Sequence, residues 1–275
     1  MQDKYVGDIG DFGKFALLNV VAGAPLRSGV IWYRNDRPEI NEDGNKIHYS
    51  SLRHLDPAVY DHLKSVRSND RTIAGLEKSG VLPANKCCFG NPVPCARSAC
   101  LSSSTRQQQC KERSEWFSKA LNVVAEADVV YLDPDNGLAP PRCGKASARS
   151  VKYVYRDEIE QLLDRKQSVI LYQHLPMVSI DGLMTRQRNL LTFNGITSAW
   201  ALSFHRISVR LYYFFAATKE HATVLRRRLD SFLASGWGAG KNPCFRFCGT
   251  LPTSPYEDEP EDQVKEFFGR LANPC

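Results

Sequence analysis

Short apolar runs rich in β-branched and aromatic residues recur along this chain, separated by segments with helical periodicity. Three of these runs predict buried strands, at residues 29–33, 128–132 and 168–172. Two further runs, 198–204 and 209–216, are joined by only four residues. Such a short connection predicts an antiparallel hairpin.

Helical patterns fill the intervals between the predicted strands. We expect helices over 14–21, 57–66, 114–125, 155–166, 183–191, 219–234 and 261–271. This alternation predicts an α/β fold, Rossmann-like, with a mostly parallel sheet, helices on both faces and a terminal antiparallel hairpin. The chain length of 275 residues fits one such domain over residues 1–275.

Residues 84–112 depart from the alternation. They lack apolar periodicity, are rich in Ser, Gln and Pro, and hold several of the nine cysteines: Cys87, Cys88, Cys95, Cys100 and Cys110. This composition predicts a surface insertion. The cysteine spacing lacks paired C-x-x-C elements, so reduced thiols and a zinc site both remain open.

The charge balance changes this picture only slightly. There are 36 Lys and Arg residues against 30 Asp and Glu, a formal charge of +6 that suits a nucleic-acid partner. The arginines at 226–228 form either the solvated face of a helix or part of such a contact. Because no signal peptide or bilayer-spanning apolar stretch is found, we expect a cytoplasmic protein without a membrane partner.

The most informative polar segment follows the run at 128–132. It reads Asp133-Pro134-Asp135-Asn136-Gly137. In an open parallel sheet, ligands bind at the carboxyl ends of the strands, and two carboxylates there need a cation or a donor to meet them. Asp133, Asp135 and Asn136 are therefore candidate site residues, although the same composition also suits a simple turn.

The run at 168–172 also ends in polar side chains, Gln173 and His174. Two neighbouring strands with such ends predict a shared cleft. Lys152, in the connection between these strands, is a candidate counter-charge for Asp133 or Asp135, with an exposed loop lysine as the ordinary alternative.

A third candidate region lies near the amino terminus, where Gly7, Gly10 and Gly13 precede Lys14. A phosphate-binding loop is excluded, because Asp8 stands where Gly is required, Phe15 replaces Ser or Thr, and no strand comes before. Glycines still permit close approach of a ligand to the backbone. Asp8, Asp11 and Lys14 are therefore candidate ligand-binding residues at this end of the chain.

This order of parts, with one strand running into Asp133 and Pro134 and a hairpin at the end, resembles class I S-adenosylmethionine-dependent methyltransferases. More narrowly, the Gly- and Asp-rich segment before Lys14 resembles bacterial large-subunit ribosomal RNA adenine methyltransferases with an N-terminal extension. The segments 131–138, 150–158 and 170–174 also resemble a group of uncharacterised bacterial proteins that share Asp-Pro-Asp-Asn-Gly-Leu. The resemblance implies a divergent methyltransferase-like enzyme that acts on nucleic acid with S-adenosylmethionine as its cofactor.

In amino-methyltransferases the equivalent loop is Asp/Asn-Pro-Pro-aromatic, and Asp133 and Pro134 match its first two positions. The resemblance implies that Asp133 orients the target amine, while Asp36 holds the cofactor ribose and Gln173 contributes to cofactor binding. Asp135 and Asn136 replace the second proline and the aromatic residue that stacks on the flipped base. A glycine-rich turn is also missing after the first strand.

Two other classes of function stay open. In a metal-dependent phosphodiesterase or nuclease, Asp133 and Asp135 would bind Mg²⁺ or Mn²⁺, His174 would act as general base, and Lys152 would stabilise developing charge. In a non-catalytic module, the same cleft would bind a nucleotide without chemistry.

Overall fold

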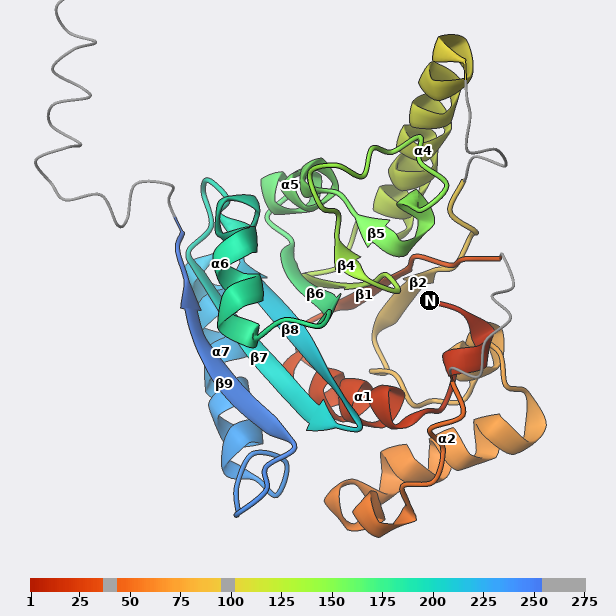
Figure 1. The fold of residues 1–275 in the computed structure, drawn as a ribbon. Helices are drawn as coiled ribbons and strands as arrows, with labels where there is room; N and C mark the ends of the chain where they lie inside the picture. The colour runs from red at the N-terminus through yellow and green to blue at the C-terminus, as the bar shows by residue number, and fades with distance from the viewer. Residues whose placement is uncertain (37–43, 95–101, 254–275) are drawn as a thin grey trace, which may run out of the picture.

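The protein forms a mixed α/β, Rossmann-like fold around a seven-stranded sheet (Figure 1). The computed structural model describes residues 1–36, 44–94 and 102–253. In spatial order the strands are β2 (Lys86–Phe89), β1 (Ser28–Trp32), β3 (Val129–Asp133), β6 (Ser168–His174), β8 (Ser208–Ala216), β7 (Ser198–Arg206) and β9 (Phe245–Leu251). The first four are mutually parallel, whereas β8 is antiparallel to both of its neighbours and β9 is antiparallel to β7.

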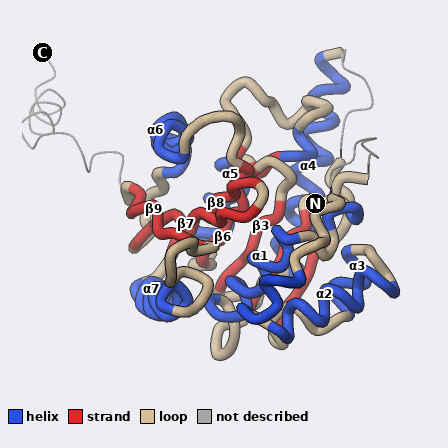
Figure 2. The backbone as a smooth tube through the Cα atoms, turned by 60° about the horizontal axis from the view of Figure 1, so that its bottom comes forward, coloured by secondary structure: helices blue, strands red, loops and turns tan. Residues whose placement is uncertain are grey.

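Helices cover both faces of this sheet, as Figure 2 shows with the strands in red between helices in blue. One face carries α1 (Ile9–Val21), α2 (Pro57–Asn69), α3 (Ile73–Lys78) and α7 (Lys219–Ala234). The other face carries α4 (Ser103–Val123), α5 (Arg156–Asp164) and α6 (Ile180–Leu191). Successive strand residues point to opposite faces of the sheet, so Val130 joins one core cluster and Tyr131 the other. Both clusters are apolar because helices cover both faces.

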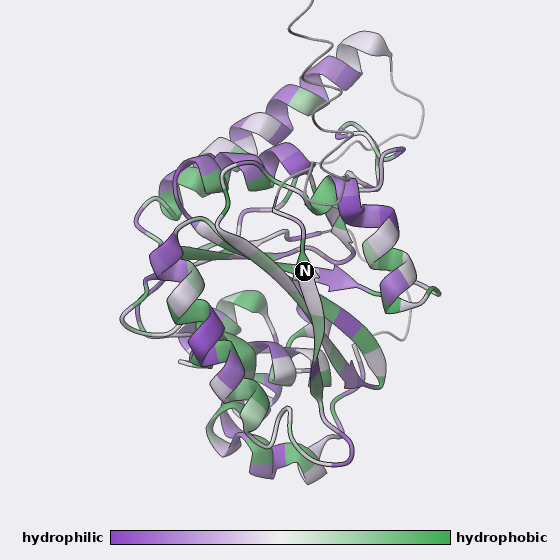
Figure 3. Cartoon of the chain, turned by 90° about the vertical axis from the view of Figure 1, so that its left-hand side faces the viewer, coloured by the Kyte–Doolittle hydropathy of each residue, from purple (hydrophilic) through white to green (hydrophobic). Residues whose placement is uncertain are grey.

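The helices alternate hydrophobic and hydrophilic segments along their length, which suits elements with one buried face (Figure 3). Three short 3₁₀ helices lie in the connections: η1 (Asp3–Tyr5), η2 (Ser50–Leu55) and η3 (Ser150–Lys152). A small parallel pair, β4 (Gly137–Leu138) and β5 (Tyr153–Val154), lies beyond the carboxyl end of β3. No helix in the described ranges is both long enough and apolar enough to cross a bilayer.

Several predicted elements are confirmed with small shifts. The five strands and the β7–β8 hairpin are present, and α7 spans residues 219–234 as expected. The cap of α2 is also confirmed, because Asp56 accepts a hydrogen bond from the Val59 amide and Pro57 begins the helix. The helix predicted at 261–271 lies outside the described residues.

The segment 84–112, predicted to be a surface insertion, contains regular structure in two places. Residues Lys86–Phe89 form β2, whose edge position leaves Cys87 and Cys88 half-buried, so the sequence lacks the apolar signal of a buried strand. The second half begins α4, which is capped by Ser102 and exposed along its first turns. An exposed helix has no apolar stripe for periodicity to detect.

The sheet reverses its order beside β1, since β2 lies on one side of this strand and β3, which follows later in the chain, on the other. Such a topological switch point opens a crevice at the carboxyl ends of the strands, where ligands bind in open α/β sheets. Asp133 is the last residue of β3 and therefore lies at this crevice.

Candidate functional site

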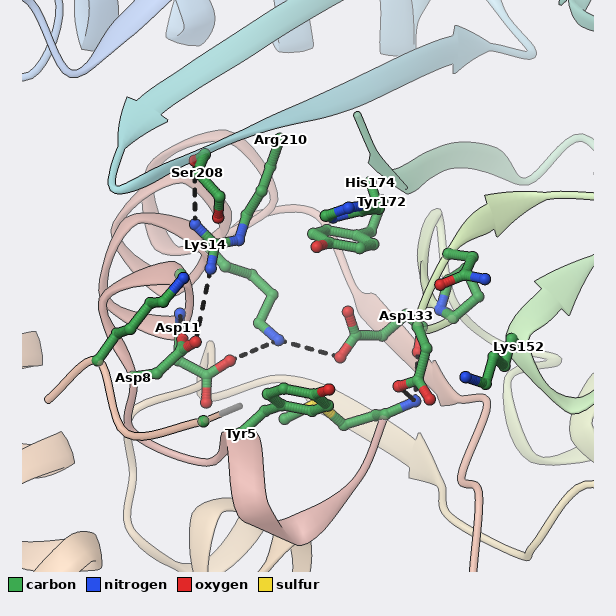
Figure 4. Close-up of a pocket in the computed structure, with 17 residues that line it drawn as sticks. Tyr5, Asp8, Asp11, Lys14, Asp133, Lys152, Tyr172, His174, Ser208 and Arg210 are labelled. Atoms are coloured by element: carbon green, nitrogen blue, oxygen red, sulfur yellow. Dashed lines mark hydrogen bonds and ion pairs between the residues drawn. The ribbon is translucent and has the colours of Figure 1, made fainter. Parts of the chain in front are cut away.

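A cavity of about 280 Å³ opens at the carboxyl ends of β3 and β6, between α1 and the start of β8 (Figure 4). All but two of the residues selected from the sequence line it: Asp8, Asp11, Lys14, Asp133, Asp135, Asn136, Lys152 and His174. The two exceptions are Gln173 and Asp36. The fold thus brings the amino-terminal candidates and the strand-end candidates to one place.

Lys14 lies at the centre of the cavity wall, between two carboxylates. Its Nζ is 2.7 Å from Asp11 Oδ1 and 3.0 Å from Asp133 Oδ2, and the three side chains are 4–5% exposed. Burial raises the pKa of Asp11 to about 6, against the opposing effect of Lys14. Burial acts to lower the pKa of Lys14, but Asp11 and Asp133 outweigh it and raise that pKa. Lys14 is therefore a fixed cation.

Asp133 is oriented from two sides. Lys14 holds Oδ2, and the buried Tyr131 hydroxyl donates a hydrogen bond of 3.0 Å to Oδ1. Each carboxylate oxygen has two lone-pair sites, so both can accept a further hydrogen bond from a ligand. Lys152 was expected to be the counter-charge of Asp133 or Asp135. The cation paired with Asp133 is Lys14, whereas the charge of Lys152 acts on Asp135.

Asp135 faces another partner. Its Oδ1 is 2.9 Å from the Met1 amine, and its Oδ2 accepts a hydrogen bond of 2.8 Å from Gln2. Burial acts to raise the pKa of Asp135, but the Met1 ammonium and the Gln2 amide outweigh it and hold that pKa below its usual value, with a smaller contribution from Lys152.

Met1 lies in the crevice at the switch point. Its amine donates hydrogen bonds to the carbonyl oxygens of Tyr33, at 2.7 Å, and of Asp133, at 3.2 Å. Tyr33 directly follows β1, and Asp133 is the last residue of β3. These two strands lie side by side at the switch point of the sheet. Together with the Asp135 carboxylate, the two carbonyl oxygens form a receptor for an ammonium group.

Gln173 lies under the cavity rather than in it. Its Nε2 donates to the carbonyl oxygens of Asn136 and His174, both at 2.8 Å, and its Oε1 accepts from the Leu138 amide at 2.9 Å. The side chain packs so closely on Gly137, which has φ of +106°, that a Cβ there would overlap it. Gln173 therefore fixes the loop that carries the strand-end carboxylates.

The segment of Lys152 is fixed from below by a buried ion pair. Arg113 Nε lies 2.7 Å from Glu158 Oε1, and both side chains are buried. The same guanidinium donates to the carbonyl oxygens of Ser150 and Tyr153, on either side of Lys152. Neither Arg113 nor Glu158 was selected from the sequence, where α4 and α5 give no sign that they meet.

Asp36 is not part of the cavity. It is exposed, and its Oδ1 is 2.7 Å from Arg34 Nε. The structure thus does not bring the residue expected to hold the cofactor ribose together with the other candidates.

Three further residues shape the cavity: Arg210, one of the basic residues near the hairpin that suit phosphate contacts, and two tyrosines that the sequence did not single out. Arg210 on β8 packs over α1 with its guanidinium 3.5 Å from Asp8, and Gly10 makes room for it, since a Cβ there would lie 2.6 Å from Arg210 Cζ. Tyr5 and Tyr172 lie below and above the space in front of Lys14 and Asp133 (Figure 4). Arg210 is recognisable in the sequence as a charged residue within the apolar run 209–216. The tyrosines gave no such signal.

The two strand-end carboxylates do not form a metal site as they stand. Asp133 faces Lys14, and Asp135 faces Met1 and Gln2, so their oxygens are directed to different partners. Across the described ranges, no three His, Cys, Asp or Glu side chains cluster in a way that could hold a metal ion.

Comparisons with known proteins add no family to these observations. No protein-family model matches the chain, and no curated protein matches it.

Proposed function

We propose that the cavity is the active site of a methyltransferase-like enzyme that acts on the exocyclic amino group of a base in nucleic acid. The observation that carries this proposal is the position of Asp133. Its carboxylate ends β3, is held by Lys14 and Tyr131, and lies between Tyr5 and Tyr172, whose rings line the same cavity (Figure 4).

Two tyrosine rings beside a carboxylate suit a planar ligand with a hydrogen-bond donor on its edge. Aromatic side chains on either side of a base stabilise it by stacking, by about 1–3 kcal/mol for each base. A base between Tyr5 and Tyr172 would direct its edge toward Asp133, whose oxygens can still accept hydrogen bonds from an amino group. The tyrosines would then supply the aromatic contact that the Asp133-Pro134-Asp135-Asn136 loop lacks.

The arrangement of the strands supports the same function. The resemblance to methyltransferases rests on a first strand, a strand ending in Asp-Pro, a further strand and a terminal hairpin. In the sheet these are β1, β3, β6 and the β7–β8 hairpin, which lie next to one another in this order with β8 against β6.

The ammonium receptor at the switch point fits one part of S-adenosylmethionine. Tyr33 O, Asp133 O and Asp135 hold the amine of Met1, and S-adenosylmethionine carries the same amine on its methionine moiety. Met1 fills this receptor, so the cofactor would have to replace it there. When bound, the cofactor supplies an electrophilic methyl group, and Asp133 would orient the amine nitrogen that receives it.

Basic residues at the cavity suit a substrate with phosphates. Lys46, Lys152 and Arg210 all line it, and Lys46 is exposed at its rim. Phosphate contacts by lysine and arginine position a nucleic acid without reading its sequence.

The first experiment measures melting temperature with S-adenosylhomocysteine and, separately, with millimolar Mn²⁺. A ligand that binds only the folded state raises the melting temperature, so we expect S-adenosylhomocysteine to raise it more than Mn²⁺ does. The opposite order, with cleavage of nucleic acid that EDTA stops, would replace this proposal with the metal-dependent phosphodiesterase.

The second experiment measures methyl incorporation into RNA and DNA. Asp133→Asn should abolish incorporation. Asp128→Asn is the matched control, because Asp128 precedes the other end of β3 and pairs with Arg27, away from the cavity. Equal activity of Asp133→Asn and wild type would refute the role of Asp133.

A further inference from the structure

The β7–β8 hairpin ends in an unusual turn beside the cavity. Arg206 and Ser208 pair directly across the two strands, so Ile207 alone forms the tip. Its backbone is left-handed, with φ of +62°, and its side chain is 65% exposed. Ser208, the next residue, lines the cavity (Figure 4).

Isoleucine is a poor choice for this position on structural grounds. Glycine and asparagine adopt left-handed backbone readily, whereas a β-branched residue there is strained. Among the described non-glycine residues, only Lys166 shares a positive φ, and it lies before the amino end of β6, whereas the hairpin tip lies near the carboxyl end of that strand. Ile207 is also mostly exposed, so packing within the protein explains an isoleucine there no better than the backbone does.

Two arginines lie on the hairpin side of the sheet, Arg206 directly beside this apolar tip and Arg246 further along on β9. Arg206 is held beside the tip by hydrogen bonds from its guanidinium to the carbonyl oxygens of His205, at 2.7 Å, and Asn242, at 2.8 Å. Arg246 on β9 pairs with Ser203 of β7, two residues before His205. A single apolar side chain near arginines offers little apolar area to a protein partner. The combination suits a nucleic acid, which has stacked bases and negatively charged phosphates.

We propose that Ile207 inserts between stacked bases of a nucleic-acid duplex, next to the nucleotide whose base enters the cavity. Apolar side chains that part a base step are a known way for proteins to unstack and kink a duplex. Arg206 and Arg246 would contact the flanking phosphates. The inference rests on the proposed function, because a base must leave its stack to reach Asp133.

The test compares the binding of short DNA and RNA duplexes with that of single strands at low salt, with 2-aminopurine in the duplexes to report unstacking. We expect Ile207→Asn to bind its duplex about tenfold more weakly than wild type while binding single strands equally. The rise in 2-aminopurine fluorescence seen with wild type should be absent. Ile207→Leu keeps an apolar side chain of the same size, so it should bind the duplex as tightly as wild type and give the same rise in fluorescence.

Stability provides the control for folding. Asparagine relieves the backbone at either left-handed position, so Ile207→Asn and Lys166→Asn should melt at or above the wild-type temperature. Only Ile207→Asn should lose duplex binding. The DNA and RNA arms show which duplex is the partner.

Two results overturn the inference, and they are distinguishable. If wild type binds duplexes and Ile207→Asn binds them equally with the same fluorescence, the insertion is refuted while the proposed function stands. If wild type binds neither duplexes nor single strands, the proposed function fails and the insertion fails with it.

Discussion

Lys14 and Asp133 form a buried ion pair, with Nζ 3.0 Å from Oδ2, although 119 positions separate them in the chain. The pair connects α1 to the end of β3 and makes the amino-terminal helix a wall of the cavity. Taking both charges out of water is costly, and the second carboxylate of Asp11 together with the Tyr131 hydroxyl helps to offset that cost.

Lys14→Met should destabilise the protein strongly. It would leave the carboxylates of Asp11 and Asp133 buried without their shared cation, and breaking a buried pair costs about 3–5 kcal/mol. The free energy of unfolding in urea measures the effect. Lys111→Met is the control, because Lys111 pairs with Glu115 on an exposed helix face, and it should change stability by less than about 0.5 kcal/mol. Equal effects of the two substitutions would contradict the buried pair.

The sequence predicted the strands and α7 well because they carry strong local signals. Fully apolar runs of five residues or so indicate buried strands, and α7 has a clear alternation of faces between Thr218, its cap, and Ala234. The start of α1 was missed by five residues, at Ile9 rather than 14, because Gly10 and Gly13 weaken a helical pattern. Both glycines are explained only by the tertiary structure, in which Arg210 and Phe204 lie against them.

Asp11→Asn should change how stability depends on pH. The pKa of Asp11 rises from 3.8 to about 6 on folding, so between these values the folded protein holds a proton that the unfolded chain has lost. The stability that this proton contributes is full below about pH 4 and disappears as pH rises through 6, a loss of about 3 kcal/mol at most.

Urea unfolding across pH 4 to 8 tests this. The wild type should lose stability relative to Asp11→Asn as pH rises. Asp61→Asn is the control, since the Arg53 hydrogen bond lowers the pKa of Asp61 at the surface and no such loss is expected there. A difference between wild type and Asp11→Asn that is constant with pH would show that Asp11 titrates normally.

The members of the site could be selected from sequence where the chain placed polar residues at strand ends, as at Asp133 and His174. Their partners could not. Asp133 meets Lys14 and Asp135 meets Met1 through contacts that span more than a hundred residues, and no local pattern predicts such contacts. Tyr172 was hidden because, within an apolar run, a tyrosine at a cavity looks the same as one in the core.

Tyr172→Ala should weaken the binding of a nucleobase ligand. Loss of one stacking surface costs about 1–3 kcal/mol. Tyr172→Phe keeps the ring, which also packs on Tyr212 with 6.1 Å between centroids, and should retain most of the affinity. Calorimetric titration with adenosine and cytidine monophosphates compares the variants. Equal losses in Tyr172→Ala and Tyr172→Phe would show that the hydroxyl, whose interaction with Arg210 raises the pKa of that guanidinium, matters instead of the ring.

Gly10→Ala should leave the stability of the fold unchanged while weakening the binding of nucleic acid. Alanine favours a helix over glycine by about 1 kcal/mol, but its Cβ would lie 2.6 Å from Arg210 Cζ. A guanidinium on a long side chain can swing aside, so the fold should keep its stability while Arg210 leaves its place beside Asp8 and Tyr172. If Arg210 contacts a phosphate, the affinity for nucleic acid should fall, and the slope of log K against log salt should decrease in size by about 1.

Gly182→Ala in α6 is the matched control, because its Cβ would meet only the capping Ser179 hydroxyl. It should leave the salt dependence unchanged. Arg210→Gln should reproduce the reduced slope of Gly10→Ala, since both variants remove the same charge from the same contact. A wild-type slope in Gly10→Ala, together with a reduced slope in Arg210→Gln, would mean that Arg210 reaches its phosphate from a position that α1 does not restrict.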